Sequence, residues 1–430
     1  MAKRRNIQDQ DWRYNALKYI VDTVVKRSYS KIRYLGRENI PNDGAIIYAP
    51  NHTGTLMDAL VLLAMDRSPK VYVARADIFK NPKLAKVLKF FKMMPIMRMR
   101  DGFDEVKKNN KTIQQATEVL KARIPFCIFP EGTHQAKHSM LPISKGIFRI
   151  ALQAKENMPN TPLYIVPVSI CYGNFWRYRS SVHIQYGKPM SVDKVVAENS
   201  EKTPQELMNV MKTDLEQRMR ETVYYIPNDE NYDATYEICA AASDGQSTAT
   251  PSANSTVKRV QELKESNPAL ADKLFALGNK AAAIRKKSGI SLKSVAAGHS
   301  ATMQIFRLFA LLLTLPYTIP AALLASPLNL LCHTIFKKFK DQAFRNSVRF
   351  IMNLLLWPLL MIIYSIIAYI CLPWQWALPT TLALLPAPFL LHDAFKAMRL
   401  MVSDCKLHNN KELKAIYQEI KEILSNQKGC

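Results

Sequence analysis

Apolar and polar residues follow one pattern up to about Tyr225 and a different one beyond about Ile305. In the first region, short apolar runs alternate with longer segments in which apolar residues recur at helical spacing. The short runs predict strands at 45–49, 71–74, 126–129, 164–171 and 182–186. The periodic segments predict helices near 56–66, 82–91, 104–122, 145–156 and 203–222. Because strands and helices alternate, we expect an α/β fold in which helices cover a sheet.

The last third of the chain contains two long stretches without a charged side chain. No Asp, Glu, Lys or Arg occurs from Leu308 to Phe336, or from Phe350 to His392. A helix needs roughly 20 apolar residues to cross a bilayer core, so the second stretch has room for two spans. Trp374 and Trp376 suit a membrane interface at the turn between them. The first stretch contains three prolines and predicts either a broken hairpin or one kinked span.

Basic clusters flank both uncharged stretches, at 285–307, 337–349 and 396–406. If positive flanks remain in the cytoplasm, each stretch enters and leaves the membrane on the same side. We therefore expect two hairpin-like insertions within 303–392. The alternative is a buried, all-helical core of a soluble domain, which seldom needs uncharged stretches of this length.

The remaining segments have distinct compositions. The first ten residues are polar and predict no signal peptide, so we expect the amino-terminal region to be cytoplasmic. An amphipathic helix is expected within 1–30, and it would pack on the next domain or lie on an anionic membrane surface. The expected organisation is a basic amphipathic helix at 1–30, an α/β domain at 31–230, a flexible linker at 240–256, a basic helical segment at 257–300, a membrane-embedded region at 303–392 and a charged helix at 393–430.

The overall charge narrows the choice of partners. The chain of 430 residues has 59 Lys and Arg against 35 Asp and Glu, which gives a formal charge of +24. This excess favours an anionic partner, namely nucleic acid, a membrane surface or a phosphorylated substrate. No nucleic-acid-binding module accompanies the charge, and the apolar third argues against that class. The seven cysteines have no CxxC spacing, so neither a structural zinc site nor a disulfide framework is expected.

The clearest candidate for chemistry is the pair His52 and Asp58, which follows the apolar run at 45–49. The pattern predicts that His52 lies in a turn and that Asp58 lies in the first turn of the next helix, with Thr55 as the N-cap. Histidine is the side chain best suited to act as a general base near neutral pH, and a carboxylate can orient it. Alone, Asp58 could instead simply favour the helix dipole.

Three further segments carry candidate binding residues. Phe129–Thr133 places Glu131 and Gly132 in a turn after a strand, where the carboxylate can accept hydrogen bonds from a polyol or from turn amides. Arg98 and Arg100 alternate with methionines and would share one face of a strand, a geometry that suits a phosphate. Pro167 lies within an apolar run and predicts a bulge or strand end.

Together these segments resemble the four motif blocks of the glycerolipid acyltransferases. Asn51-His52 with Asp58, the Arg98/Arg100 segment, Phe129–Thr133 and Val166–Val168 occur in the order and rough spacing of that superfamily, over residues 30–230. Five residues separate His52 from Asp58, where the common pattern has four. A similar longer spacing is found in the branch that includes fungal glycerol-phosphate and dihydroxyacetone-phosphate acyltransferases. The resemblance implies a mixed sheet covered by helices, to which this chain adds a C-terminal helical membrane region.

The resemblance also implies roles for particular residues. His52 would remove a proton from the acceptor hydroxyl as it attacks an acyl thioester, and Asp58 would orient His52. The expected substrate-binding residues are Arg98 or Arg100 with Lys145 for the phosphate, Glu131, Gly132 and Thr133 for the glycerol, and Pro167 for the thioester side. No metal or other cofactor is expected, although His134 and His138 have a spacing that metal sites also use.

The resemblance implies an O-acyltransferase of the cell (inner) membrane with its catalytic domain on the cytoplasmic side. Its donor would be acyl-CoA or acyl-carrier protein, and its acceptor would be 1-acylglycerol-3-phosphate, giving phosphatidate. The alternative acceptor is glycerol-3-phosphate or dihydroxyacetone phosphate. Membrane lipids are expected partners and nucleic acid is not. A rival of a different class is a non-catalytic lipid-binding membrane scaffold, but such a protein would not need His52, Asp58 and Glu131.

Overall fold

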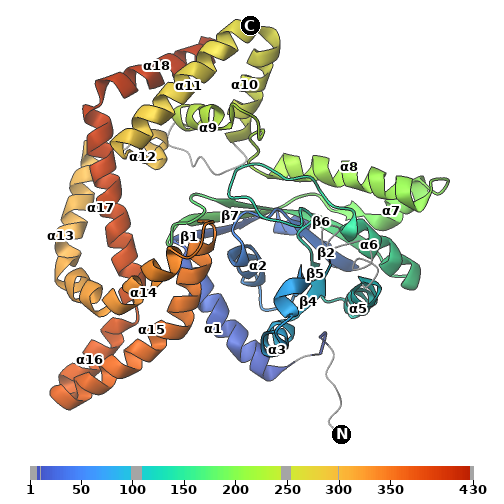
Figure 1. Ribbon diagram of the computed structural model, residues 1–430, viewed down its shortest axis with the longest axis horizontal. Helices are drawn as coiled ribbons and strands as arrows, with labels where there is room; N and C mark the ends of the chain where they lie inside the picture. The colour runs from blue at the N-terminus through green and yellow to red at the C-terminus, as the bar shows by residue number, and fades with distance from the viewer. Residues whose placement is uncertain (1–6, 10, 98–108, 244–252, 299, 427–430) are drawn as a thin grey trace. The chain divides into compact units, whose positions relative to one another are not determined.

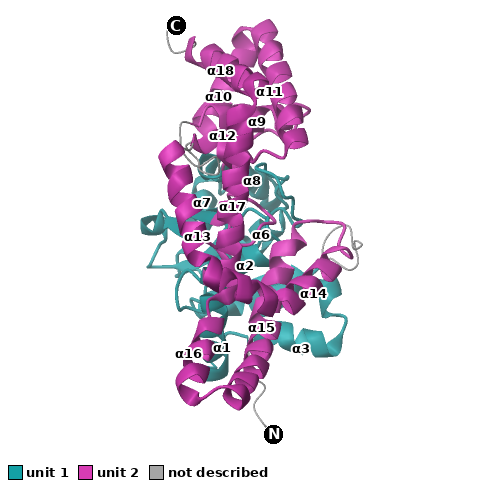
Figure 2. Ribbon diagram, turned by 90° about the vertical axis from the view of Figure 1, so that its left-hand side faces the viewer, with its two compact units in different colours: residues 1–26, 32–171, 182–223 teal, residues 27–31, 172–181, 224–430 magenta. Residues whose placement is uncertain are grey.

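The computed structural model describes residues 7–9, 11–97, 109–243, 253–298 and 300–426. The chain divides into two compact units, coloured teal and magenta in Figure 2. The first unit comprises residues 1–26, 32–171 and 182–223, and the second comprises residues 27–31, 172–181 and 224–430. Each unit is therefore assembled from segments that are separated in the sequence.

An eight-stranded sheet forms the first unit, in the order β1-β7-β6-β2-β5-β3-β4, with β8 paired to β6. The strands β2, β5, β3 and β4 are parallel neighbours, so their carboxyl ends lie at the same end of the sheet. The β6–β8 pair is antiparallel, so the sheet is mixed, as expected. The strands are β1 (Lys31–Leu35), β2 (Ala45–Pro50), β3 (Val71–Arg75), β4 (Met93–Ile96), β5 (Phe126–Cys127), β6 (Leu163–Tyr172), β7 (Ser181–Tyr186) and β8 (Met190–Ser191).

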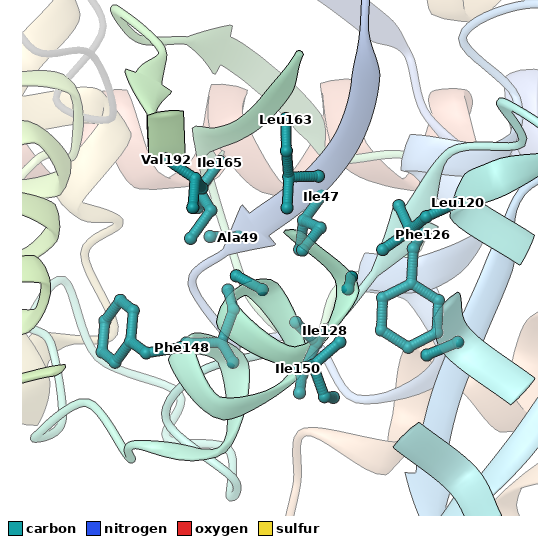
Figure 3. Packing of buried hydrophobic residues seen from close by; sticks show 14 of the residues in the cluster. Ile47, Ala49, Leu120, Phe126, Ile128, Phe148, Ile150, Leu163, Ile165 and Val192 are labelled. Atoms are coloured by element: carbon teal, nitrogen blue, oxygen red, sulfur yellow. The ribbon is translucent and has the colours of Figure 1, made fainter. Parts of the chain in front are cut away.

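Helices pack on this sheet (Figure 1). The apolar side chains between the sheet and the helices are buried. Figure 3 shows Ile47 of β2 and Ile165 of β6 on the sheet side of this core, and Phe148 and Ile150 on the helix that packs against it. Burying each such side chain contributes about 1.5–3 kcal/mol. The helices of the first unit are α1 (Trp12–Ser28), η1 (Arg37–Asn39), α2 (Leu56–Leu63), η2 (Ala76–Phe79), α3 (Pro82–Phe90), α5 (Asn109–Lys121), α6 (Gly146–Asn157), α7 (Val192–Glu198) and α8 (Pro204–Thr222).

All five expected strands and all five expected helices are present, most with boundaries shifted by one to three residues. The expected strands did not include β1, whose side chains alternate between exposed and half-buried, β4, which contains Pro95, or β8, which has only two residues. It was wrong about Pro167, because β6 runs through this proline as one continuous strand of ten residues. The missing N–H of Pro167 is tolerated because the neighbouring chain has a gap between β7, which ends at Tyr186, and β8, which begins at Met190. No regular strand in this gap requires a hydrogen bond from residue 167. The N–H of Gly187 donates to Pro167 O across this gap.

Five helices of the second unit form a bundle around a buried ion pair. They are α9 (Tyr232–Ala241), α10 (Asn254–Ser266), α11 (Pro268–Ser288), α12 (Leu292–Ala297) and α18 (Lys411–Asn426). Glu237 is only 2% exposed, and its two oxygens lie 2.7 and 2.9 Å from Nε of Arg285. The hydroxyl of Tyr417 donates to the same carboxylate over 2.6 Å, so α9, α11 and α18 share one polar contact inside their apolar interface.

The other helices of the second unit are markedly apolar. They are α13 (Ala301–Leu324), α14 (Ser326–Phe336), α15 (Phe344–Cys371), α16 (Trp374–Leu384) and α17 (Ala387–Asn409). Within the described residues, two helices, α13 and α15, are long and apolar enough to cross a membrane, and only 11% of the most apolar window of each is buried. A core helix of a soluble protein would be mostly buried, so the exposure argues against the soluble alternative.

The chain between α15 and α17 follows the expected turn but not a simple hairpin. The helix α15 ends at Cys371 and α16 begins at Trp374, where the sequence predicted the turn. The returning chain is broken, because α16 has 11 residues and spans about 16 Å at 1.5 Å per residue. This length is about half of a bilayer core. The number of membrane crossings therefore stays a prediction.

The buried ion pair leads to a stability prediction. Replacing Glu237 by Ala leaves the Arg285 guanidinium buried without its carboxylate, which typically costs about 3–5 kcal/mol. The thiol of Cys239 is buried and reacts with a thiol reagent only after unfolding, so its reactivity reports unfolding. The urea concentration at the midpoint of this transition should fall accordingly. Glu262→Ala removes an exposed partner of Lys258 in the same bundle and should have little effect. Equal midpoints for the two variants would contradict the proposed importance of the buried pair.

Candidate active site

The site begins where β2 ends and the chain turns toward α2. Asn51 directly follows β2 and is almost completely buried. Its backbone N–H donates to Val168 O, and its side-chain amide pairs with the backbone of Ile170, with Nδ2 donating over 3.2 Å and Oδ1 accepting over 2.6 Å. Asn51 thus extends the pairing of β2 with β6 by one residue and fixes the point at which the chain leaves the sheet.

A single carboxylate oxygen organises the turn that follows. Nδ1 of His52 lies 2.7 Å from Oδ2 of Asp58, and the same oxygen accepts the backbone N–H groups of Thr53 and Gly54 over 2.8 and 2.7 Å. Asp58 lies in the first turn of α2 and is fully buried. His52 is in the turn and Asp58 is on the helix, as the sequence predicted. Asp58 therefore does more than favour the helix dipole, because it closes the turn around His52.

Thr55 is the N-cap residue of α2, as expected, but it does not cap the helix with its side chain. Thr55 has a backbone φ of 55°, and its side chain makes no capping hydrogen bond. Left-handed φ values are strained for a β-branched residue, and such strain persists only where surrounding contacts impose it. Here the carboxylate of Asp58 accepts the amides of Thr53 and Gly54, which precede the helix. The strained turn is thereby held in the shape that brings His52 to Asp58.

The hydrogen-bond pattern defines which nitrogen of His52 is available. An ionised carboxylate only accepts, so Nδ1 carries the proton shared with Asp58, and Nε2 has the free lone pair of the neutral ring. The His52 side chain is 19% exposed, so it can be reached from outside. Its ring stacks on Phe129 with centroids 4.3 Å apart, and His134 meets it edge-on at 5.6 Å. A histidine held in one tautomer beside a buried carboxylate has the geometry of a general base.

Glu131 ties a second loop to this turn. Its Oε1 accepts the backbone N–H of His52 over 3.1 Å, and its Oε2 accepts that of Leu141 over 3.2 Å. The N–H of Gln135 donates in return to His52 O. Burial raises the pKa of the Glu131 carboxyl to about 7, although the two amide hydrogen bonds oppose this increase. The loop after β5 and the turn after β2 are consequently joined on both sides of His52.

The structure places the other predicted residues at different distances from this centre. Gly132, with φ of 64°, and Thr133 follow Glu131 and are exposed. Lys145 precedes α6, next to Ser144, whose N–H donates to Pro130 O, so it lies at the far end of the same loop. Pro167 is buried inside β6. The pair Arg98 and Arg100 lies outside the described residues, just after β4 ends at Ile96.

The sequence reasoning did not single out Arg75. This residue ends β3, and β3 lies between β5 and β4 in the sheet. Its carboxyl end therefore points to the same end of the sheet as those of β2 and β5, which lead to His52 and Glu131. Nε of Arg75 donates to Asp77 over 3.0 Å, and its side chain is about half exposed. A basic residue that ends a strand candidate is a signal that could have been used, but only the strand order makes it specific.

The described residues contain no group of three or more His, Cys, Asp or Glu side chains that could hold a metal ion. The two histidines that suggested one lie in different surroundings. His134 contacts the ring of His52. His138 is buried, and desolvation lowers its pKa to about 3, so it is neutral. What the arrangement can do chemically is accept a proton at Nε2 of His52 and stabilise the resulting imidazolium with Asp58.

Comparisons with known proteins agree with the motif resemblance. Residues 31–171 match the family model described as Acyltransferase. The chain is 27% identical over 132 residues to the chloroplastic 1-acyl-sn-glycerol-3-phosphate acyltransferase BAT2 of Brassica napus, covering 30% of this chain and 36% of that protein. It is 31% identical over 101 residues to glycerol-3-phosphate O-acyltransferase 2 of Saccharomyces cerevisiae, covering 24% of this chain and 14% of that protein.

Among solved structures, the chain is similar to the 1-acyl-sn-glycerophosphate (LPA) acyltransferase PlsC of Thermotoga maritima. The TM-score is 0.33 at 21% identity, and the match covers 49% of this chain and 83% of that chain. The two sequence relatives are matched over 36% and 14% of their own length, so the likeness concerns one domain and not the whole proteins. The matched residues 31–171 include His52, Asp58, Glu131 and Pro167.

The raised pKa of Glu131 predicts a pH dependence of stability. The folded carboxyl binds its proton more tightly than the unfolded one, whose ordinary pKa is 4.5. The free energy of unfolding should therefore fall as pH rises from about 4.5 to about 7, by roughly 3 kcal/mol. Urea denaturation followed by circular dichroism across this range measures the slope. Glu131→Gln should remove this contribution, whereas Glu156→Gln, at an exposed glutamate of α6, should retain it. Equal slopes in both variants would contradict the assignment.

Proposed function

Because residues 31–171 of this chain form a domain of the acyltransferase family, we propose that the protein transfers a fatty acyl group from an acyl thioester to the hydroxyl of a glycerol phosphate. The preferred acceptor is 1-acylglycerol-3-phosphate, which would become phosphatidate. The observation that carries the proposal is the Asp58–His52 pair, held 2.7 Å apart inside the matched segment and open to solvent at His52.

The proposed reaction is a direct transfer with His52 as the base. Nε2 of His52 takes the proton of the acceptor hydroxyl while the hydroxyl oxygen forms a bond to the thioester carbonyl carbon. The carbon–sulfur bond then breaks, and the imidazolium returns the proton to the leaving thiolate, so charge and atoms balance. Asp58 holds the ring in the required tautomer and stabilises the imidazolium between these two steps.

Glu131 acts first as a positioning residue in this scheme. Both of its oxygens accept backbone amides, one of them from His52 itself, so the carboxyl fixes the backbone that carries the base. With a pKa of about 7 it is divided between its two protonation states near neutral pH. The ionised form has remaining lone pairs for an acceptor hydroxyl, and the protonated form can donate one hydrogen bond. Gly132 and Thr133, exposed beside it, are proposed to contact the glycerol.

The phosphate would be held by basic residues at the carboxyl end of the parallel strands. Arg98 and Arg100 follow β4, and Arg75 ends β3, which lies one strand closer to the Glu131 loop. Guanidinium groups grip a phosphate with two parallel hydrogen bonds, which an isolated lysine cannot do. Lys145 remains a proposed helper from the start of α6. Pro167 is proposed to act on the thioester side only by forming the wall of the sheet, because it is buried in β6.

The proposal places the enzyme at a membrane. Two apolar helices with exposed side chains support membrane association, and the charge of +24 favours an anionic surface. We propose the inner cell membrane with the catalytic domain on the cytoplasmic side, and acyl-CoA or acyl-carrier protein as the donor. The second candidate acceptor, glycerol-3-phosphate or dihydroxyacetone phosphate, is favoured by the 31% identity to a protein named glycerol-3-phosphate O-acyltransferase.

Acyl transfer can be tested with the purified full chain in detergent. Radiolabelled acyl thioester is offered with 1-acylglycerol-3-phosphate, glycerol-3-phosphate or dihydroxyacetone phosphate. We expect turnover with the first acceptor, and a loss of roughly 10²–10⁴-fold in His52→Ala because the base is removed. His408→Ala, at an exposed histidine of α17, is the matched control and should keep full activity. Undiminished turnover in His52→Ala would refute the base assignment, and no turnover with any acceptor would favour the non-catalytic scaffold.

The role of Asp58 predicts a separate kinetic effect. Asp58→Asn keeps the shape of the side chain but removes the charge that stabilises the imidazolium and permits the wrong tautomer of His52. We expect kcat to fall by roughly 10²–10⁴-fold while KM for the acceptor changes little, because Asp58 does not contact the acceptor. The measurement is a steady-state comparison of both constants. A change confined to KM would mean that Asp58 serves binding and not catalysis.

A further inference from the structure

The helix α3 is unusual because the protein buries none of its side chains. It has nine residues, Pro82 to Phe90, and no buried residue. Leu84 and Val87 are 44% and 48% exposed, and Ile78 of the preceding η2 is 38% exposed. An isolated helix of this length is marginal in water, and most helical stability in proteins comes from packing an apolar face. Asn81 caps its first turn, but a cap alone contributes only about 1 kcal/mol.

All charged side chains from Ile78 to Lys92 are positive. Between Ile78 and Lys92 there are five lysines and no acidic residue. Lys80, Lys83, Lys86 and Lys89 are exposed, whereas Lys92 is buried and donates to the backbone oxygens of Ile7 and Asp9. At about 100° per residue, the helical lysines gather on one arc of α3, and Leu84, Val87 and Leu88 gather on the opposite arc.

A second helix of the same unit, α1, contacts α3 and carries exposed aromatic side chains on another face. Phe90 of α3 meets Tyr14 of α1 edge-on, with ring centroids 6.2 Å apart, and the two helices lie close together at the foot of the sheet in Figure 1. Tyr14, Val21 and Val25 bury one face of α1 in the first unit. On other positions Trp12 is 74% exposed and Tyr19 is 71% exposed. The sequence allowed two roles for this helix, packing on the next domain or lying on an anionic membrane surface. The two roles are compatible, because one face of α1 is buried and another is exposed.

We propose that η2 and α3, flanked by α1, form a docking surface for an anionic lipid bilayer. The arguments for this occupant are the exposed lysines and the absence of an acidic residue from Ile78 to Lys92, the opposed lysine and apolar arcs of α3, and exposed aromatic side chains on α1 of the kind that favour membrane interfaces. Asp77, the acidic residue of η2, is paired with Arg75. Lysine stems can lie along the acyl boundary while their ammonium groups reach the headgroup phosphates. A bilayer is also the partner that the exposed apolar helices of the second unit require. The surface would supply the missing burial for α3.

The position of this surface in the first unit connects it to the site. The segment η2 begins directly after Arg75, at the carboxyl end of β3, so exposed Ile78 lies three residues from the end of the sheet at which His52 and Glu131 are found. An amphiphilic acceptor held in the interface would reach this end of the sheet without entering water. The docking itself does not depend on the reaction and is tested without turnover.

The docking is tested with spin labels on the full chain in nanodiscs of phosphatidylcholine and phosphatidylglycerol in equal amounts. Exposed Cys371 and Cys405, together with Cys430, are first replaced by Ser, and a label is placed by Leu84→Cys or Val87→Cys. Lys194→Cys on α7 is the control, since its side chain is 72% exposed and α7 follows β8, away from the β4 edge. We expect labels at 84 and 87 to collide with oxygen dissolved in the bilayer and to be shielded from a water-soluble relaxation agent. The label at 194 should show the reverse.

Charge reversal then tests the lysines. Lys83→Glu, Lys86→Glu and Lys89→Glu together should shift the ratio of docked to undocked label by at least roughly a hundredfold, because the loss of each lysine near an anionic surface already accounts for about fivefold and each added Glu is repelled. The matched control replaces three exposed lysines away from the β4 edge, Lys188, Lys194 and Lys202, by Glu. It makes the same change in net charge and should leave the label at 84 docked. Nanodiscs of phosphatidylcholine alone should resemble the first triple variant.

Two results would overturn the proposal. One is a label at position 84 in anionic nanodiscs that is as accessible to the aqueous agent as the label at 194. The other is a label at 84 that is shielded from the aqueous agent but does not collide with oxygen dissolved in the bilayer, which would show that protein, and not the bilayer, covers α3. Circular dichroism of each variant checks that it is folded. If the triple variant does not fold, the single-label variants still test the proposal.

Discussion

The hydrogen bonds to one oxygen, Oδ2 of Asp58, are the constraint on which the site depends. Two backbone amides and the ring of His52 converge on this atom, which belongs to a fully buried side chain. A buried carboxylate is tolerated only when such donors replace water. The turn in return adopts a left-handed φ at Thr55 that a β-branched residue avoids elsewhere. The local strain, the tautomer of His52 and the direction of its free nitrogen all follow from this arrangement.

The sheet gives this turn its surroundings. Parallel pairing of β2 with β5 brings the ends of both strands to the same place, so Glu131 reaches the backbone of His52 although 79 residues separate them. The two carboxyl groups of the site consequently differ in environment. Asp58 is surrounded by three donors, whereas Glu131 receives two longer backbone hydrogen bonds and has a pKa of about 7 because of burial. One group is suited to stabilise a cation, and the other is suited to exchange a proton or bind a hydroxyl near neutral pH.

The two units differ in how much of their apolar surface is buried. The first unit buries a conventional core of aliphatic side chains between sheet and helices, but fully buries no side chain of α3. The second unit contains one helical bundle centred on the Glu237–Arg285 pair and, apart from it, helices whose apolar side chains mostly face outward. Exposed apolar surface of this extent requires a partner. For a chain whose residues 31–171 match an acyltransferase family model and whose net charge is strongly positive, the proposed anionic bilayer meets that requirement.

The amino-acid sequence by itself determined the elements and the central pair. Period-two and helical patterns located the strands from 45–49 onward, and the spacing of His52 and Asp58 placed the first in a turn and the second on a helix, because these are local properties of the chain. Only the tertiary structure decided the strand order, which brings Arg75 to the end of the sheet where the site lies, and the continuity of β6 through Pro167, which depends on a gap in a neighbouring strand. Likewise, the role of Asn51 and the exposure of α3 depend on contacts with residues distant in sequence. Such contacts leave no periodic trace in a single chain, so no local pattern could have predicted them.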